Sequence, residues 1–408
     1  MTNKKFKVGI LRETKTPPDR RVPLTPSHAT DILREYPNVE LKIQSSDLRC
    51  FTDEEYRNSG LSVVNDIDDC DILIGVKEVY IPTLIPEKTY LFFSHTTKEQ
   101  PYNRKLLQEI VKKKITLLDY EYLTDRNNVR LVAFGRWAGI VGAYNGLRAW
   151  GEQFGTFYLK PAHKCHDMKE MLGHLGQVKL PDIKILITGG GRVAHGALEI
   201  FSALNLKVVT PDEFITKSFN EPVICQIDAD NYVKRIDGSD FNFQHFFNNP
   251  KLYESIFRPY TKVTDLYIPC HYWDPNSPVF MTKEDMKAGD FRMKVIADVS
   301  CDIKGPVPST LRASTIANPF YGYNPLTCEE TAAFEPSGIT VMAVDNLPGE
   351  LPRDASEDFG KLLLEKVFSS FFGEDREGII ERATIAENGK LTRSFAYLQD
   401  YLEGTAYL

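Results

Sequence analysis

Two side chains that can move protons follow directly on short apolar runs of this sequence. Lys77 comes after residues 71–76 (DILIGV), and His95 comes after residues 92–94 (FFS). Parallel α/β sheets collect their functional groups at the carboxyl ends of strands. A lysine there can act as a base because burial lowers its pKa, and histidine is the usual proton carrier near neutral pH. One such residue is more often structural, but two of them after successive apolar runs indicate acid–base chemistry.

Other polar side chains in this part of the sequence could hold a substrate. Arg21 lies in the segment RVPLTP before an expected helix, where an arginine could bind a carboxylate through two parallel hydrogen bonds. Lys98 and Gln100 follow shortly after the histidine, and Glu121 and Arg130 bracket a hairpin-like stretch. A surface arginine, a solvated helix start and a plain ion pair are the respective structural alternatives.

Acidic and hydroxyl groups follow two later apolar runs. Ser300 and Asp302 come after residues 295–299, and Asp345 comes after residues 341–344. Any one of these groups could simply cap a loop or a helix. Their shared position after expected strands is the reason to group them with a candidate site.

A glycine-rich turn provides a second chemical signature. The apolar run 183–188 (IKILIT) leads into GGGRVA at 189–194, and a helix is expected to continue to about residue 203. Gly189 would allow the tight turn, and Gly191 would let the backbone approach a pyrophosphate at the helix N-terminus. Ala194 takes the place of the third glycine. Strand, turn and helix in this order favour a dinucleotide site over a turn without a ligand.

The acid that usually follows the second strand of such a site is missing. Residues 207–209 (KVV) are the expected second strand, and Thr210 follows them. A carboxylate there would bind the ribose 2′-hydroxyl and repel a 2′-phosphate. Because Thr210 is neutral, NADP and NAD are both compatible with the sequence, with a lean to NADP. Asp212 could be the displaced acid, and no obvious arginine replaces it.

The elements that must carry these residues alternate between strands and helices. The expected strands are residues 6–11, 39–43, 71–76, 90–93, 115–118, 183–188, 207–209, 296–299 and 341–344, and the main helices are 25–35, 135–154, the one ending near 203, and 354–372. This rhythm predicts an α/β architecture with parallel sheets. The segment 135–154 is expected to be a long connecting helix whose glycines allow close packing against a neighbour.

Length and composition limit the class of protein. The 408 residues are too many for one ordinary core and predict two domains, while 42% apolar and 26% charged residues are typical of a folded protein. A net charge of −7 without a basic stripe argues against nucleic acid as a partner. Without a long apolar run or a signal-peptide pattern, we expect no membrane contact and a cytoplasmic location.

The cysteines predict neither disulfides nor a metal. Seven of them are scattered along the chain without a C-x-x-C pair, which is typical of reduced, buried thiols. Cys165 lies near His163, His166 and His174, but this spacing matches no standard zinc pattern. We therefore expect no metal.

Taken together, the motifs resemble a known family. The chain is similar to the L-lysine-forming saccharopine dehydrogenases, and most closely to the lysine–ketoglutarate reductase domain of bifunctional lysine-degradation enzymes. It is more distantly similar to alanine dehydrogenase and the transhydrogenase α-subunit. The resembling segments are RVPLTP (21–26), GVKEV (75–79), FFSHTTKEQ (92–100), LLDYEYL (117–123), VRLVAFGRWAGIVGA (129–143), ITGGGRVAHGA (187–197), ADVSCDIKG (297–305) and VDNLPGELPRDASEDFG (344–360). They extend over nearly the whole chain and are far more specific than a glycine turn.

The resemblance implies an α/β fold of two Rossmann-like domains with parallel sheets and an active site in the cleft between them. The substrate domain would comprise residues 1–135 and 330–408, and the dinucleotide-binding domain residues 136–329. The implied reaction joins L-lysine to 2-oxoglutarate with reduced NADP or NAD and gives saccharopine, or runs backwards. The implied partners are these small molecules, and a homodimer is compatible with the sequence.

The resemblance also implies roles for individual residues. Lys77 and His95 would be the catalytic acid–base pair. Substrate contacts are expected from Arg21, Lys98, Gln100, Phe134, Ser300 and Asp302. Cofactor contacts are expected from Gly189, Gly191, Arg192, Val193, Thr210, Arg130, Val299 and Asp345.

Two departures from the family's pattern and two alternatives accompany this interpretation. The second-strand acid is absent, and the reductase domain is usually fused to a partner that cleaves saccharopine, which this sequence lacks. Alanine dehydrogenase-like chemistry, with ammonia as the amine, is the first alternative; FFSHTTKEQ and DVSCD argue against it. A non-catalytic nucleotide-binding regulator is the second; the lysine, the histidine and the glycine turn argue against it.

Overall fold

A computed structural model describes residues 5–405 and divides them into two compact units. Unit 1 contains the described residues up to Ala133 together with those from Pro352 onward, and unit 2 runs from Phe134 to Leu351. Each unit is built on an eight-stranded sheet with helices around it, which confirms the predicted α/β class. The division of the chain differs from the expected one, because residues 330–351 lie in unit 2.

Unit 1 has a mostly parallel sheet in the order β18-β17-β6-β5-β4-β1-β2-β3. Its strands are β1 (Phe6–Ile10), β2 (Val39–Gln44), β3 (Ser62–Val64), β4 (Ile72–Ile74), β5 (Thr89–Phe92), β6 (Thr116–Asp119), β17 (Thr384–Glu387) and β18 (Lys390–Leu391). The six strands from β6 to β3 run parallel, whereas β17 and β18 are antiparallel additions from the far end of the chain. The short buried runs predicted from the sequence form the centre of this sheet.

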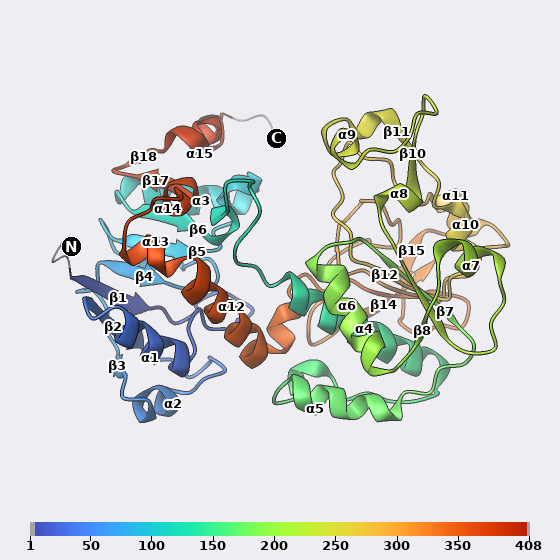
Figure 1. Ribbon diagram of the computed structural model, residues 1–408, viewed down its shortest axis with the longest axis horizontal. Helices are drawn as coiled ribbons and strands as arrows, with labels where there is room; N and C mark the ends of the chain where they lie inside the picture. Colours follow the sequence, from blue (N-terminus) through green and yellow to red (C-terminus); the bar gives the residue numbers. More distant parts are fainter. Residues whose placement is uncertain (1–4, 406–408) are drawn as a thin grey trace. The chain divides into compact units, whose positions relative to one another are not determined.

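The helices of unit 1 also come from both parts of the chain. They are α1 (Pro26–Glu35), α2 (Asp53–Asn58), α3 (Pro101–Lys112), α12 (Pro352–Lys366), α13 (Phe368–Phe372), α14 (Ile379–Ala383) and α15 (Gln399–Glu403). The predicted start of α1 is confirmed: the Thr25 side chain accepts a hydrogen bond from the His28 amide, and Pro26 is the first helical residue. Figure 1 shows α1 beside α12, so the late segment completes the same layer as the first helix.

Hydrogen bonds tie the returning segment to the early one. The amide of Val22 donates to the Ser356 hydroxyl oxygen at 2.9 Å. Arg353 donates to the Cys50 carbonyl at 2.6 Å and to the Glu55 carboxylate at 2.8 Å. Unit 1 is therefore one structure made from two separate stretches of chain.

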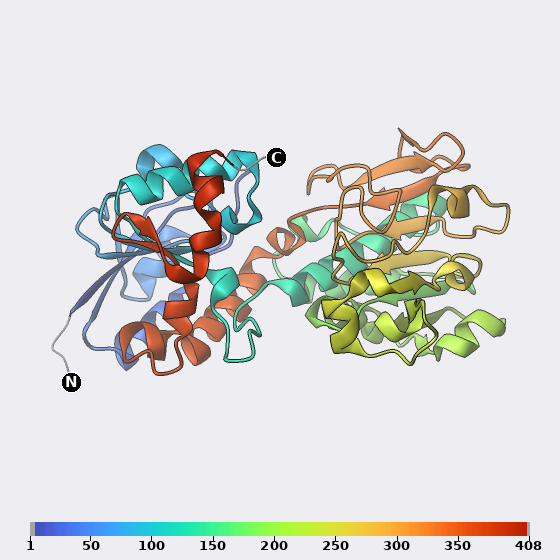
Figure 2. The ribbon, with the colours of Figure 1, turned by 90° about the horizontal axis from the view of Figure 1, so that it is seen from above.

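Unit 2 has its sheet in the order β15-β14-β16-β13-β12-β7-β9-β8. Its strands are β7 (Lys184–Thr188), β8 (Lys207–Val208), β9 (Val223–Ile227), β12 (Leu266–Pro269), β13 (Val295–Ala297), β14 (Phe320–Asn324), β15 (Glu329–Thr331) and β16 (Ile339–Met342), with a separate hairpin of β10 (Val233–Arg235) and β11 (Tyr253–Ser255). In Figure 2, the orange segment around β14 and β15 and the yellow-green segment around β8 and β9 lie at opposite edges of the unit.

Two features of this sheet differ from the sequence prediction. The expected second strand, β8, has only two residues, both exposed, and forms the edge, while the buried β9 pairs with β7 along its whole length. Burial explains the exchange, since an apolar strand (VICQI) gains more from the sheet interior than a short polar one. The expected boundary at residue 330 is wrong because β16 pairs with β13 and β14 and continues the sheet.

The helices of unit 2 include the long helix predicted from the sequence. They are α4 (Gly135–Phe154), α5 (Met168–Gly173), α6 (Arg192–Ala203), α7 (Pro211–Thr216), α8 (Ala229–Tyr232), α9 (Phe243–Asn248), α10 (Arg258–Thr261) and α11 (Lys283–Lys287). Glycines bring α4 and α6 into backbone contact, as predicted. A Cβ on Gly139 would collide with the Val193 carbonyl, and a Cβ on Gly196 would collide with the Arg136 carbonyl.

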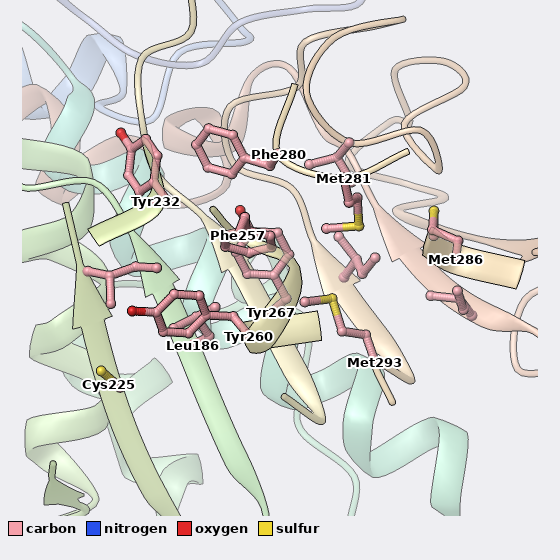
Figure 3. Packing of buried hydrophobic residues seen from close by; sticks show 14 of the residues in the cluster. Leu186, Cys225, Tyr232, Phe257, Tyr260, Tyr267, Phe280, Met281, Met286 and Met293 are labelled. Atoms are coloured by element: carbon pink, nitrogen blue, oxygen red, sulfur yellow. The ribbon is translucent and has the colours of Figure 1, made fainter. Parts of the chain in front are cut away.

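The segment between Phe214 and Pro259, in which the sequence shows no functional motif, contributes to the core of unit 2. Aromatic and sulfur-containing side chains from that segment and from later loops pack on the sheet (Figure 3). The labelled members of this cluster are Leu186, Cys225, Tyr232, Phe257, Tyr260, Tyr267, Phe280, Met281, Met286 and Met293. This segment therefore supplies core residues as well as the strands β9, β10 and β11. Among residues 5–405, no helix is long and apolar enough to cross a membrane.

Candidate active site and dinucleotide loop

The sheet of unit 1 changes direction between β1 and β4. From β1 the chain builds outward through β2 and β3, and then returns to place β4 on the other side of β1. Such a switch point leaves a crevice at the carboxyl ends of the strands, where α/β proteins bind ligands. The loops after β1, β4, β5 and β6 all begin at this edge. They carry the residues that the sequence singled out.

Lys77 follows β4 and lies against the loop after β1. The two carboxylate oxygens of Glu13 accept hydrogen bonds from the amides of Val76 (2.6 Å) and Lys77 (2.9 Å). Burial lowers the pKa of Lys77 to about 8, and the nearby charge of Arg21 acts in the same direction. Burial also raises the pKa of Glu13 to about 8, against the effect of the two amide hydrogen bonds. Lys77 can therefore exchange a proton near neutral pH.

His95 follows β5 and is paired with a carboxylate from the loop after β4. Its Nδ1 lies 2.5 Å from Glu78 Oε1, and the Lys15 ammonium lies 3.0 Å from Glu78 Oε2. Although burial favours the neutral acid, the hydrogen bond with His95 and the two positive charges bring the pKa of Glu78 to about 2. A carboxylate on Nδ1 orients the ring and leaves Nε2 as the nitrogen that can serve a substrate.

A buried acid fixes the loop that carries His95. Asp119, at the end of β6, accepts hydrogen bonds from the Ser94 amide (2.8 Å), the Ser94 hydroxyl (2.6 Å) and the Glu121 amide (2.8 Å). His95 itself has a φ of 52°, in the left-handed region that side chains avoid. The surrounding hydrogen bonds therefore stabilise a backbone conformation of the histidine that is unfavourable by itself.

Arg21 is buried and already bound to a carboxylate. Its Nε and Nη2 donate to the two oxygens of Asp19 at 3.0 and 2.6 Å. Burial favours the neutral acid, but the Arg21 guanidinium holds the pKa of Asp19 below its usual range. A substrate carboxylate could use this edge of Arg21 only by displacing Asp19. The expected substrate contact thus competes with an internal one.

Three further candidates gather after β5 and β6. Glu121 Oε1 lies 3.8 Å from the Lys98 ammonium and 3.5 Å from Arg130 Nη2, as the ion-pair interpretation of Glu121 and Arg130 predicted. Both cations are about half exposed, with 49% and 51% of their side-chain surface accessible. Gln100 is exposed and precedes α3, and its side-chain oxygen accepts a hydrogen bond from Tyr102. Lys98 is therefore within reach of a ligand from solvent.

The glycine turn of unit 2 has the geometry expected for a dinucleotide. Gly189 has a φ of 105°, and a Cβ there would lie 2.8 Å from the Cys270 carbonyl oxygen at the end of β12. Gly191 has open space where a Cβ would be, and no side chain caps the helix α6 that follows it. The turn lies between β9 and β12, the two neighbours of β7, where this sheet changes direction. It leaves backbone N–H groups for an anionic ligand.

Asp228, rather than Thr210, occupies the place of the second-strand acid. It follows β9, the neighbour of β7, and a Cβ on Gly190 would collide with its Oδ2. Thr210 follows the edge strand β8, and its hydroxyl accepts a hydrogen bond from the Glu213 amide at 3.3 Å. The expectation that Thr210 occupies the acid's position is therefore wrong, because the strand order places β9 between β8 and the glycine turn.

The remaining candidates of unit 2 lie along the same edge of the sheet. Val299 and Ser300 follow β13, and their amides donate to the Pro269 carbonyl at 3.0 and 3.2 Å. The Ser300 hydroxyl donates to the buried Asp298 at 2.6 Å. Burial, reinforced by Asp298, raises the pKa of Asp302 to about 6. Asp345 follows β16 and is exposed.

Three residues flank the turn or begin the unit. Arg192 and Val193 are the first residues of α6, and Arg192 is exposed beside the turn. Phe134 is buried and immediately precedes α4.

The candidate residues are divided between the two units. Unit 1 contains Lys77, His95, Arg21, Lys98, Gln100 and Arg130, and unit 2 contains the glycine turn with Val299, Ser300, Asp302 and Asp345.

A cluster with metal-ligand chemistry lies near α5. Ligand atoms of Cys165, Glu170 and His174 lie within 4.8 Å of one another. The Lys160 ammonium, however, lies 2.5 Å from Glu170 Oε1 and already neutralises that carboxylate. The expected absence of a metal stays a prediction.

Sequence reasoning missed Glu13, Glu78 and Asp228. Lys77 was a candidate because it follows an expected strand. Glu13 meets the same criterion, since it lies three residues after the end of β1. The role of Glu78 could not be predicted from the sequence, since its hydrogen bond with His95 depends on the pairing of β4 with β5. Asp228 follows β9, a strand that is not among those predicted from the sequence.

The fold of this chain is similar to that of known proteins. Residues 9–141 match the family model of the alanine dehydrogenase/PNT N-terminal domain. An L-alanine dehydrogenase structure superimposes with a TM-score of 0.67 at 17% identity, covering 98% of this chain and 100% of that one. A transhydrogenase from Sinorhizobium meliloti gives 0.61 at 13% identity, covering 95% and 100%. The chain has the two-unit α/β fold of these proteins.

More specific relatives share its sequence. Alpha-aminoadipic semialdehyde synthase of Arabidopsis thaliana is 29% identical over 96% of this chain and 41% of its own length. The mitochondrial enzyme of that name from Bos taurus is 30% identical over 97% and 48%. Saccharopine dehydrogenase [NAD(+), L-lysine-forming] of Neurospora crassa is 26% identical over 86% and 88%. The chain spans less than half the length of the first two. The predicted resemblance is confirmed.

Proposed function

We propose that this chain joins L-lysine to 2-oxoglutarate by reductive amination to form saccharopine, or catalyses the reverse oxidation. The observation that carries the proposal is the pair of proton carriers at one switch point: Lys77 with a pKa of about 8, and His95 bound through Nδ1 to Glu78. The names of the relatives support the choice of substrates. Acid–base chemistry alone would fit other amines and keto acids as well.

The two proton carriers have complementary tasks in this reaction. Neutral Lys77 Nζ takes a proton from the lysine ε-nitrogen as this nitrogen attacks the ketone. Lys77 returns this proton to the former ketone oxygen, which becomes the carbinolamine hydroxyl. His95 Nε2 then gives a second proton to this hydroxyl, which leaves as water, and the carbinolamine becomes a protonated imine. Glu78 stabilises the protonated imidazole that this step requires. The residues of the unit 1 site thus cover the proton transfers from the nitrogen and to the oxygen.

The substrates bring several carboxylates that need cationic partners. Lys98 is half exposed beside the site, and we assign it to a substrate carboxylate. A direct contact from Arg21 would require Asp19 to release one edge of the guanidinium. Arg21 acts in any case through its charge, since it lowers the pKa of Lys77 together with burial.

The unit 2 turn fits a nicotinamide dinucleotide. Open space over Gly191 and the uncapped start of α6 suit a pyrophosphate, with Arg192 and Val193 as the adjoining residues. Val299 and Asp345 are assigned to the rest of the cofactor. Substrate contacts are assigned to Ser300, Asp302, Phe134 and Gln100. The reduced nicotinamide supplies, when bound, the hydride that the imine accepts.

The loss of reduced-nicotinamide absorbance tests the proposal. We expect rapid oxidation of NADH or NADPH only when L-lysine and 2-oxoglutarate are both present. Pyruvate with ammonia is the control pair for alanine dehydrogenase chemistry. Lysine-independent oxidation, or oxidation with the control pair alone, would reject the saccharopine proposal. A cytoplasmic location and small-molecule partners are part of the same proposal.

A further inference from the structure

The strand next to the glycine turn determines which residue can meet the ribose of a bound dinucleotide. β7 ends in the turn, and its neighbour on that side is β9, paired in register from Lys184–Val223 to Thr188–Ile227. The residue that follows β9 therefore stands where dinucleotide-binding folds carry their ribose acid. That residue is Asp228, 37 positions beyond Gly191, because β8 and α7 intervene in the sequence.

Side chains at the end of β9 point at the glycine turn. Gln226 Nε2 donates to the Gly189 carbonyl at 2.8 Å, and the Gly189 amide donates to the Ile227 carbonyl at 2.8 Å. Alternate residues of a strand share a face, so Asp228 projects to the same side as Gln226. Its Oδ2 lies against Gly190, so close that a Cβ there would collide with it.

Asp228 also has a structural role. Its side chain caps the four-residue helix α8: Oδ1 accepts a hydrogen bond from the Ala229 amide at 2.8 Å, and the side chain also accepts one from the Asn231 amide. Oδ2 is the oxygen that faces the turn. A cap alone would be served as well by serine or asparagine, which carry no charge.

We propose that Asp228 binds the ribose diol of the adenosine half and makes NAD(H) the preferred cofactor, which reverses the lean to NADP drawn from Thr210. This inference rests on the proposed function. The diol can donate two hydrogen bonds to a carboxylate, whereas a 2′-phosphate would place like charges in contact.

The other acid near this part of the sequence provides a matched control. Asp212 was the candidate for a displaced acid, and it lies in α7, after the edge strand β8. It is exposed, and β9 separates its strand from β7. Asp212→Asn removes the same charge as Asp228→Asn without touching the turn.

Equilibrium binding to the full chain tests the inference without relying on turnover. Dissociation constants for NADH and NADPH are measured by isothermal titration calorimetry for the wild type, Asp228→Asn and Asp212→Asn. We expect the wild type to favour NADH by about tenfold or more, the size of one charge-assisted hydrogen bond. Asp228→Asn should lose most of this preference, and Asp212→Asn should keep it. Asp228→Ser, which can also cap α8, repeats the test if the asparagine variant does not fold.

The outcomes separate this inference from the proposed function. Equal or tighter binding of NADPH by the wild type, or an unchanged preference in Asp228→Asn, overturns the role of Asp228. Binding of neither nucleotide overturns both proposals. An NADH preference that depends on Asp228, in a protein that does not oxidise NADH with lysine and 2-oxoglutarate, upholds the inference and rejects the function.

Discussion

At the scale of single residues, the candidate site obtains its chemistry from neighbours that are themselves charged and enclosed. Lys77 has a low pKa because it is buried near Arg21, and Glu78 stays ionised because His95 and Lys15 compensate its burial. Removing any of these groups should therefore change the proton affinity of another. Such coupling makes pH profiles more informative than single rates.

Lys77→Met should lower kcat for saccharopine formation by about a hundredfold or more, the usual contribution of a general base. In the wild type, kcat/KM should rise with pH through about 8, because the base must lose its proton before it can act. The free ε-amine of lysine titrates near 10.4 and produces a separate rise. Steady-state rates across pH provide the measurement.

Glu13 also has a pKa raised to about 8, so its variant is the necessary comparison. The inflection near pH 8 should persist in Glu13→Gln and disappear from the residual activity of Lys77→Met. Lys105→Met, at an exposed position of α3, should behave like the wild type. Full turnover by Lys77→Met would exclude this lysine as the base.

His271 provides a prediction about stability. It follows β12, its Nδ1 lies 2.7 Å from the Thr188 hydroxyl, and burial lowers its pKa to about 3. In the unfolded chain this histidine binds a proton below about pH 6.5, whereas in the folded protein it stays neutral until the pH is much lower. The free energy of unfolding should therefore fall as the pH drops from about 6.5 toward 3, by up to about 1.4 kcal/mol per pH unit from this group.

Denaturant unfolding at several pH values would measure this slope. His271→Gln should flatten it, whereas the same change at the exposed His195 should leave it as in the wild type. If both variants keep the wild-type slope, burial of His271 does not control acid sensitivity.

At the scale of elements, the dinucleotide turn depends on how closely α4 and α6 approach. Gly139 and Gly196 let the two helix backbones touch, and this contact fixes the helix whose N-terminus follows the turn. Further along α4, a Cβ on Gly146 would lie 3.1 Å from Ala297 of β13. A helix of small residues is thus clamped between another helix and the sheet.

Gly139→Ala should lower the free energy of unfolding by about 2 kcal/mol or more, since the new methyl meets the Val193 backbone rather than a movable side chain. The gain in helix propensity, about 1 kcal/mol, opposes this effect and does not outweigh it. Gly173→Ala in α5, which meets no atom within 4 Å, is the control and should be neutral or slightly stabilising. Equal stabilities of the two variants would refute the close-packing argument.

At the scale of the whole molecule, the sequence predicted the class of fold and the outline of the site. Buried runs with polar ends identified the central strands, and the glycine turn identified the start of α6. The order of the strands could not be predicted from the sequence, because it depends on which strand gains more free energy from burial in the sheet. In unit 2, β9 therefore lies next to β7, the position expected for β8. The predicted domain boundary at residue 330 was wrong for a similar reason. It depends on the pairing of β16 with β13 and β14, which are contacts between strands far apart in the sequence.

Unit 2 should fold by itself when residues 134–351 are expressed alone. It is one continuous stretch with a complete eight-stranded sheet and its own core. Circular dichroism should show cooperative thermal unfolding, and added NADH should raise the midpoint because a ligand stabilises the state it binds. An unfolded fragment would contradict the description of unit 2 as independent.

Residues 1–133 alone should not unfold cooperatively. They lack β17, β18 and α12. They therefore also lack the Ser356 hydroxyl oxygen that accepts from the Val22 amide and the Arg353 guanidinium that donates to the Cys50 carbonyl. Adding residues 352–408 as a separate peptide should restore a cooperative transition. A cooperative transition without the peptide would show that the late segment is dispensable.

The split of unit 1 has a consequence for biosynthesis. The ribosome synthesises the chain from its N-terminal end. The whole of unit 2 is therefore synthesised before the last helices and edge strands of unit 1. During that interval the edge of β6 that β17 later covers is an open strand edge, which can pair with another chain. The lysine and histidine of the candidate site are thus made early, but the unit that supports them is finished last.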